Sequence, residues 1–254
     1  MEPAEDFTKI ESIFVRHRNA LVIRGQFTPI YTDYYLHLMQ HGIRHAAEFD
    51  QMLKDALAML TLHLVARPWA ETIAWTVNLR APRLNLFVTG GSGQESVTGR
   101  MFTEDVREPD RNFFYSQTTA PNQHEPRTST LEVDGKDPVA WISQFYDQSE
   151  QRPARAFRLE DENFVLVAAQ PDCDMEWFDG LTEESVAAIE TTEETKVLET
   201  RRFRFHCGCT LERILPVLGG WKDRLDELFE DADVIKVQCP RCAANYRVTR
   251  DMLA

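Results

Sequence analysis

Five cysteines are the residues in this sequence whose type and spacing could do chemistry. Cys207 and Cys209 form a C-x-C pair, Cys239 and Cys242 form a C-x-x-C pair, and 29 residues separate the two pairs. Two close thiol pairs on separate segments suit a tetrahedral zinc ion, which proteins bind through thiolate sulfur at about 2.3 Å. Gly208 permits the tight turn that two adjacent ligands need. The pattern predicts one zinc ion per chain, held by these four thiolates.

His206 and Cys173 are the other residues that could take part in metal or redox chemistry. His206 could replace one of the thiols as a ligand, although four thiols are already at hand. Cys173 lies between Asp172 and Asp174, whose negative charges disfavour its thiolate, so we expect it to have no functional role. The alternative to a redox-active centre is a structural zinc site that only stabilises the fold, which is a common role for zinc bound by four cysteines.

No catalytic constellation accompanies these cysteines. No Ser/His/Asp set or pair of catalytic carboxylates stands out, and the seven histidines are scattered along the chain. A closed shell of four thiolates also leaves zinc no open position for a substrate. We therefore expect that the protein is not an enzyme.

The composition indicates a protein that stays in solution and avoids polyanions. The 254 residues carry a net charge of −13 and a pI near 5.0, which argues against nucleic acid and anionic membranes as partners. Residues 1–6 are acidic with no apolar run behind them, unlike a secretory signal, and no stretch approaches the roughly 18 apolar residues of a membrane span. Cytoplasm is the expected compartment, where thiols stay reduced and serve metal or redox chemistry.

The periodicity of apolar residues predicts an α+β fold in three regions. Residues 1–170 form an N-terminal mixed α/β-sheet core domain. Residues 171–204, with ten acidic and four basic side chains, form a short acidic linker with one or two weak helices. Residues 205–254 form a small C-terminal zinc-binding α+β module. The predicted helices are 32–45, 48–66, 138–147, 210–218 and 221–229, and the predicted strands are 20–25, 72–79, 84–88, 113–119, 129–133, 156–158, 163–169, 234–237 and 246–248.

Several stretches, together with the spacing of the cysteines, are similar to one known family. The most telling is Tyr146–Phe157, YDQSEQRPARAF, which contains Ser149-Glu150-Gln151. Shorter similar stretches are Ile23-Arg24-Gly25, Leu84-Asn85-Leu86, Gly99-Arg100 and Asn245-Tyr246. On these residues the chain resembles the thirty-three-kilodalton heat-shock protein family, over nearly its whole length and at low identity.

The resemblance implies a redox-regulated, ATP-independent holdase chaperone. By that likeness the four cysteines bind zinc when reduced, and on oxidation Cys207 pairs with Cys209 and Cys239 with Cys242. The freed tail and linker then hold unfolding or oxidatively damaged client proteins, and a homodimer accompanies activation. The segment before Cys207 is shorter than in well-known members by roughly fifteen to twenty residues, a tolerant place for length changes. The shortened linker predicts activation by oxidant without heating.

Metal binding can act as a switch because it is also folding free energy. Structural zinc contributes on the order of 10–16 kcal/mol, against about 5–15 kcal/mol for the stability of whole domains. A tail of some fifty residues that loses zinc should therefore unfold.

Two other functions stay open. The first is a relative with purely structural zinc that acts as a constitutive chaperone or adaptor. The second is a zinc-ribbon nucleic-acid binder, which the negative charge disfavours, or an enzyme, which the closed thiolate shell disfavours.

Overall fold

The structure, a computed structural model, describes residues 7–123, 125–230 and 232–253. The acidic N-terminal residues 1–6, on which the absence of a signal sequence was argued, lie outside the described residues. None of the helices in the described part of the chain is long and apolar enough to cross a membrane.

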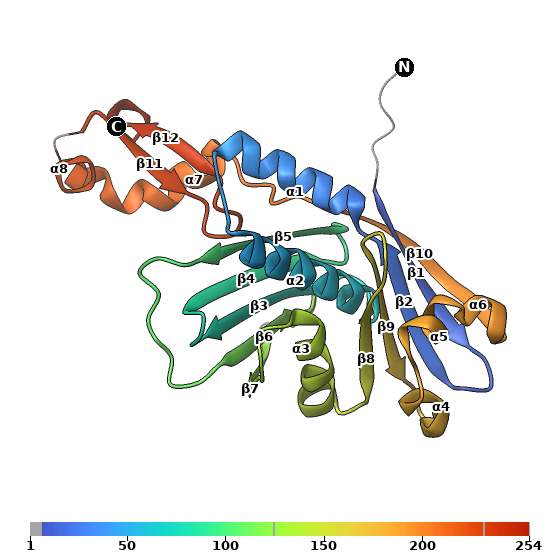
Figure 1. Cartoon of the computed structure of the whole chain (residues 1–254). Coiled ribbons are helices and arrows are strands. Elements are labelled where there is room, and N and C mark those ends of the chain that lie inside the picture. The colour runs from blue at the N-terminus through green and yellow to red at the C-terminus, as the bar shows by residue number, and fades with distance from the viewer. Residues whose placement is uncertain (1–6, 124, 231, 254) are drawn as a thin grey trace, which may run out of the picture.

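Ten strands form one mixed sheet in the order β7-β6-β3-β4-β5-β10-β1-β2-β9-β8 (Figure 1). Neighbours are antiparallel except β5 and β10, which meet in a short parallel contact at Arg204–Ser96 and Phe205–Val97. This contact joins two five-stranded halves. The strands are β1 (Thr8–Val15), β2 (Ala20–Gln26), β3 (Thr72–Leu79), β4 (Leu84–Gly91), β5 (Ser96–Phe102), β6 (Phe113–Thr119), β7 (Arg127–Glu132), β8 (Ala154–Arg158), β9 (Asn163–Ala169) and β10 (Thr195–Phe205).

Three helices, α1 (Thr28–His41), α2 (Ala47–Val65) and α3 (Pro138–Phe145), cover one face of the sheet (Figure 1). Every residue of α2 from Met52 to Val65 is buried, and these side chains join the main core with those of both half-sheets. The structure confirms the α+β class and the predicted helix 48–66. Helix α1 starts and ends four residues before the prediction, because Pro29 is accommodated in its first turn and Gly42, at φ 62°, ends it.

Residues 171–204 differ from the predicted linker. They form the short helices α4 (Met175–Asp179), α5 (Glu183–Ala187) and α6 (Ile189–Thr192), and most of strand β10. Strand β10 pairs with β1 over eight residue pairs and lies in the middle of the sheet. This strand could not be recognised from the sequence because most of its residues are polar or charged, and one of its buried positions is an arginine. Arg201 is buried together with Phe203 and Phe205. Strands β1 and β5 were also missed.

The short helices are not weakly attached either. Phe178, Leu181, Val186 and Ile189 are buried in a second apolar cluster, formed with β1, β2, β8 and β9 on the sheet face away from α2. Arg18 reinforces this packing by ion pairs to Asp174 at 2.6 Å and Glu193 at 3.1 Å. The segment is therefore docked on the core along most of its length.

The C-terminal residues form a small module at one end of the molecule (Figure 1). Its elements are α7 (Leu211–Leu218), a 3₁₀ turn (Gly219–Arg224), α8 (Leu225–Phe229), β11 (Val234–Gln238), β12 (Asn245–Thr249) and a final 3₁₀ turn (Arg250–Met252). Its apolar core is minor: Phe229, Val248 and Leu253 are buried, whereas no residue of α7 is. So little buried surface fits a module that depends on a further staple.

Candidate metal centre

Two tight backbone segments carry the four cysteines to one point. Cys207 and Cys209 follow the end of β10, and Gly208 between them adopts φ 66°. Cys239 and Cys242 lie in the turn between β11 and β12. That turn is closed by backbone hydrogen bonds from the Cys239 N–H to the Ala244 carbonyl at 2.9 Å and from the Ala243 N–H to the Cys239 carbonyl at 3.0 Å. Local backbone geometry thus sets the spacing of the two cysteines within each pair.

The four sulfur atoms all lie within 4.8 Å of one another. The Sγ atoms of Cys207 and Cys239 are 3.7 Å apart, and those of Cys209 and Cys242 are 3.4 Å apart. A tetrahedron with metal–sulfur distances of about 2.3 Å has edges of roughly 3.8 Å, whereas a disulfide needs about 2.05 Å. All the cysteines are free thiols. The four predicted ligands therefore come together as a donor set that could hold a metal ion.

Burial differs between the two pairs. Cys239 and Cys242 are 3% and 1% exposed, whereas Cys207 and Cys209 are half-buried. Hydrogen bonds from the Cys207 and Cys242 thiols, followed by backbone N–H groups of the turn, lower the pKa of Cys239. The bond to Cys239 in turn raises the pKa of Cys207 to about 12. A metal ion at this position would be bound by thiolates, so its binding would be accompanied by release of protons from these sulfurs.

Core residues bind the C-x-x-C turn through its carbonyl oxygens. Arg100 on β5 donates from Nη1 to the Cys239 carbonyl at 2.9 Å, and His37 on α1 donates from Nε2 to the Cys242 carbonyl at 2.8 Å. His41, one turn further along α1, accepts from the Asn245 backbone N–H at 3.2 Å. The centre is therefore also the place where the module is fixed to the core.

Tyr246 is a further residue of the site. Its hydroxyl lies 2.9 Å from the Cys209 carbonyl oxygen and 3.2 Å from the Cys209 sulfur. The family resemblance included Gly99-Arg100 and Asn245-Tyr246 without giving them a role. The two α1 histidines were missed, and their i, i+4 spacing was the only local signal that could have found them.

His206 and Cys173 stand apart from this set. His206 is exposed and does not belong to the group of metal-type ligands that the described residues bring together. Cys173 packs against the second apolar cluster, where burial, with the Asp174 and Asp179 charges, raises its pKa. Its position fits the expectation that it takes no part in the centre.

The fold and the site define a class: an α+β protein whose small C-terminal module is closed by a four-thiol, metal-type centre. A family profile described as "Hsp33 protein" matches residues 160–249. The chain is 23% identical to the "33 kDa chaperonin" of Proteus mirabilis, with 90% of each chain covered. It is 36% identical to that of Bacillus licheniformis over 75 residues, which is 26% of the relative's length. The profile covers about a third of the chain, and the relatives are either of low identity or matched over a short stretch. These findings support the Hsp33 family of chaperones as the family that this chain resembles.

A solved structure supports the same fold. The crystal structure of the 33 kDa chaperonin from Thermotoga maritima superposes with a TM-score of 0.74, covering 98% of this chain and 97% of the other at 13% identity. The likeness includes both the ten-stranded core and the module, since nearly the whole chain is covered.

Proposed function

We propose that this protein is a redox-regulated, ATP-independent holdase chaperone with one zinc ion bound by Cys207, Cys209, Cys239 and Cys242 when reduced. The observation that carries the proposal is the convergence of four free thiols within 4.8 Å in a module with a minimal apolar core. An all-sulfur donor set of this size favours zinc over hard cations. The proposed partners are unfolding or oxidatively damaged proteins in the cytoplasm, without nucleic acid or membrane.

Oxidation of the centre needs two equivalents of peroxide. A thiolate attacks one peroxide oxygen, the O–O bond breaks, and hydroxide leaves a sulfenic acid on sulfur. A second thiolate then attacks that sulfur, a disulfide forms, and a second hydroxide leaves. Half-buried Cys207 and Cys209 give the oxidant access to the centre. Zinc, when bound, supplies the charge that keeps the sulfurs deprotonated, and two disulfides leave it no ligands.

The pairing of the cysteines decides what oxidation does to the module. The family resemblance implies disulfides Cys207–Cys209 and Cys239–Cys242, which close tiny loops and restrain little of the chain. Sulfur contacts of 3.7 Å and 3.4 Å in the structure instead join Cys207 to Cys239 and Cys209 to Cys242. Disulfides across those contacts would keep the two segments together. Peptide mapping by mass spectrometry distinguishes the pairings, and the switch requires the neighbour pairing.

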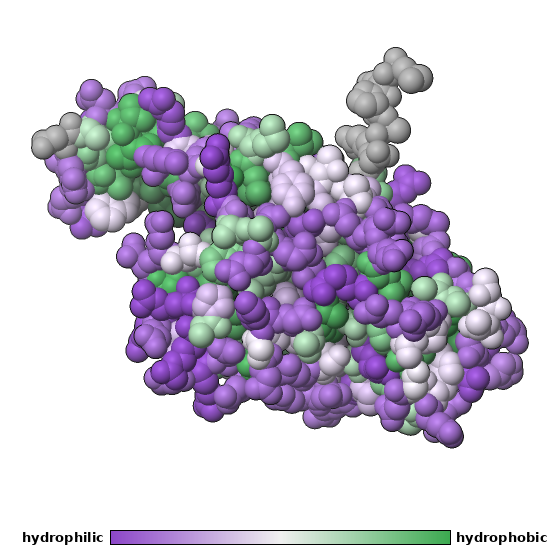
Figure 2. Space-filling model, viewed as in Figure 1, coloured by the Kyte–Doolittle hydropathy of each residue, from purple (hydrophilic) through white to green (hydrophobic). Residues whose placement is uncertain are grey.

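Unfolding of the module would create a sticky surface. Hydrophobic side chains already gather over α7 and α8 (Figure 2), and Val217 is 79% exposed. Leu211, Leu215, Leu218 and Leu225 are only partly buried against Phe229. Release of these side chains gives unfolding clients, or a second activated chain in a homodimer, an apolar surface to bind.

The test combines zinc release with client holding. The zinc-loaded protein is treated with peroxide at room temperature, and zinc release and aggregation of a denatured client are followed together. Cys242→Ser should lose bound zinc, whereas the matched Cys173→Ser should keep both zinc and the response. Zinc release without suppression of aggregation would refute the holdase function. Zinc retained under strong oxidant would refute the switch.

A second candidate is a constitutive chaperone or adaptor with purely structural metal. The hydrogen bonds of Arg100 and His37 to the cysteine carbonyls favour it, because they make the centre a staple between module and core. It predicts equal client holding by the reduced and the oxidised protein, which the same assay measures.

A further inference from the structure

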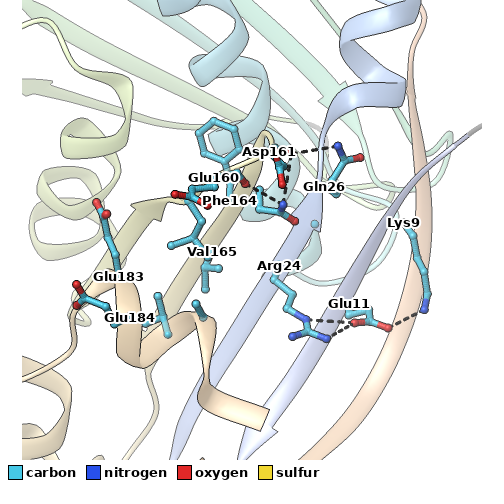
Figure 3. Close-up of a pocket in the computed structure, with 15 residues that line it drawn as sticks. Lys9, Glu11, Arg24, Gln26, Glu160, Asp161, Phe164, Val165, Glu183 and Glu184 are labelled. Carbon is cyan, nitrogen blue, oxygen red and sulfur yellow. Dashed lines mark hydrogen bonds and ion pairs between the residues drawn. The ribbon is translucent and has the colours of Figure 1, made fainter. Parts of the chain in front are cut away.

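A cavity of about 720 Å³ opens on the sheet face away from α2 (Figure 3). It lies between strands β1 and β2, the β8–β9 turn with the start of β9, and helix α5. A volume of this size suits one or two large side chains. None of the cysteines lines it, and α5 and the metal-type module lie at opposite ends of the molecule (Figure 1).

The floor of the cavity is apolar. Val165 and Val186 contribute to the lining and are each at least nine-tenths buried, and half-buried Leu159 adds to them. Such a floor favours an aliphatic stem over water.

Four carboxylates stand around this floor. Glu160 and Asp161 lie on the β8–β9 turn, and Glu183 and Glu184 lie in the first turn of α5 (Figure 3). All four are exposed, and none makes an ion pair within the part of the chain that the structure describes. The turn is fixed to strand β2, because the Asp161 carbonyl accepts a hydrogen bond from the Gln26 side chain at 3.1 Å.

The two cations of the lining are already neutralised. Lys9 and Arg24 both donate to Glu11, at 2.7 Å and 2.9 Å, and Arg24 also pairs with Glu190 on α6. Glu11 is therefore occupied, while the carboxylates on the turn and on α5 are available. The open cavity thus combines an apolar floor with uncompensated negative charge at its rim.

We propose that this cavity binds an arginine or lysine side chain from an unfolded client segment. The aliphatic stem lies on Val165, Val186 and Leu159, and the cationic head lies among the rim carboxylates, as such side chains do at mixed surfaces. That the ligand is a client segment rests on the proposed holdase function. Anionic ligands are repelled by the same rim. Because no cysteine lines the cavity, this binding does not need oxidation.

A binding assay on the reduced, zinc-loaded chain tests the site. Fluorescence anisotropy follows a short labelled peptide of alternating Arg and Leu, with a matched peptide of alternating Glu and Leu as the comparison. The Glu160→Gln/Asp161→Asn variant should weaken binding of the basic peptide about fivefold, as expected for two half-exposed ion pairs. The matched control, Glu104→Gln/Asp105→Asn, removes two exposed acids outside the cavity and should leave binding unchanged.

A second variant tests whether the open space of the cavity, and not only the negative charge around it, is needed for binding. Ala187 lines the cavity and is exposed, so Ala187→Trp fills the space and keeps every carboxylate. Loss of basic-peptide binding in this variant supports the site. Equal binding of the acidic and basic peptides, or unchanged binding in both cavity variants, would overturn it. Aggregation suppression after oxidation, measured in parallel, reports on the holdase function alone, so the two ideas can fail separately.

Discussion

Arg100 is a core side chain that binds the C-x-x-C turn directly. Besides its bond to the Cys239 carbonyl, it donates to Gln238 at 3.1 Å and stacks on Phe102. Because hydrogen bonds from a charged donor contribute about 1.5–3 kcal/mol, Arg100→Ala should loosen the module. We expect faster amide hydrogen exchange in β11 and β12.

The matched control for this prediction is Arg111→Ala. Arg111 stacks near Phe113 and pairs with Glu132 on the surface, and loss of such a pair changes stability by no more than about 1 kcal/mol. Equal exchange in the Arg100 variant and the wild type would mean that the turn is held by other contacts.

His63 is a fully buried histidine in α2. Burial lowers its pKa well below the usual range, and the charges of Arg67, Arg152 and Arg127 add to this effect. Its Nδ1 lies 2.9 Å from the Tyr146 hydroxyl. The unfolded chain binds a proton at His63 as the pH falls through about 6.5, whereas the folded chain does not. The free energy of unfolding is therefore unaffected by His63 above that pH, and below it decreases by up to about 1.4 kcal/mol per pH unit.

Urea unfolding measures this dependence. The free energy of unfolding of wild type should fall between neutral and mildly acidic pH more steeply than that of His63→Asn. His17→Asn replaces an exposed histidine and should follow the wild-type slope. If the free energy of unfolding of wild type and of His63→Asn depends on pH in the same way, His63 is not the cause of the pH dependence.

At the scale of elements, strand β10 decides where the core ends. It lies between β5 and β1 and carries the chain from α6 to Cys207. Without it, β1 loses one of its two partner strands, and without α4–α6 the second apolar cluster loses its cover. A truncation after Gln170 should therefore be molten or insoluble. The sequence alone had predicted that residues 1–170 fold independently as a core domain, and this experiment decides between the two predictions.

A truncation after His206 is the matched comparison. It keeps β10 and the whole ten-stranded sheet, and removes only the module. We expect it to melt cooperatively in calorimetry. A cooperative transition in the shorter fragment as well would show that β10 is dispensable for the fold of the core.

At the scale of the whole molecule, the packing of the chain predicts how far oxidation spreads. Four buried apolar side chains anchor α4–α6, each contributing about 1.5–3 kcal/mol, whereas the module has a minor apolar core and, on the function proposed above, depends on bound metal. Oxidant should therefore unfold residues 207–253 and leave residues 175–205 protected. Hydrogen exchange followed by mass spectrometry, before and after peroxide, measures both segments in one experiment.

The alternative outcome has its own meaning. Joint loss of protection in both segments would show that the docked helices belong to the switch. Activation without heat, expected from the family resemblance, stays a prediction in either case, and the docking of α4–α6 would limit what oxidant alone exposes.

Some features of this protein follow from the sequence because their information is local. The C-x-C and C-x-x-C pairs define their own ligand geometry within two tight turns, so the four-thiol set could be predicted. The stripe of α2 and the alternation of β3 and β6 are likewise written into adjacent residues. These elements were predicted within one residue at each end.

Other features were decided only by tertiary structure. Strand β10 is charged and becomes a central strand because β1 and β5 supply its hydrogen-bonding partners and the burial of Arg201, Phe203 and Phe205. The Arg100 and His37 contacts to the cysteine turn join residues more than a hundred positions apart, and the acidic cavity is assembled from four separate segments. No local pattern encodes such contacts, because each depends on where the rest of the chain packs.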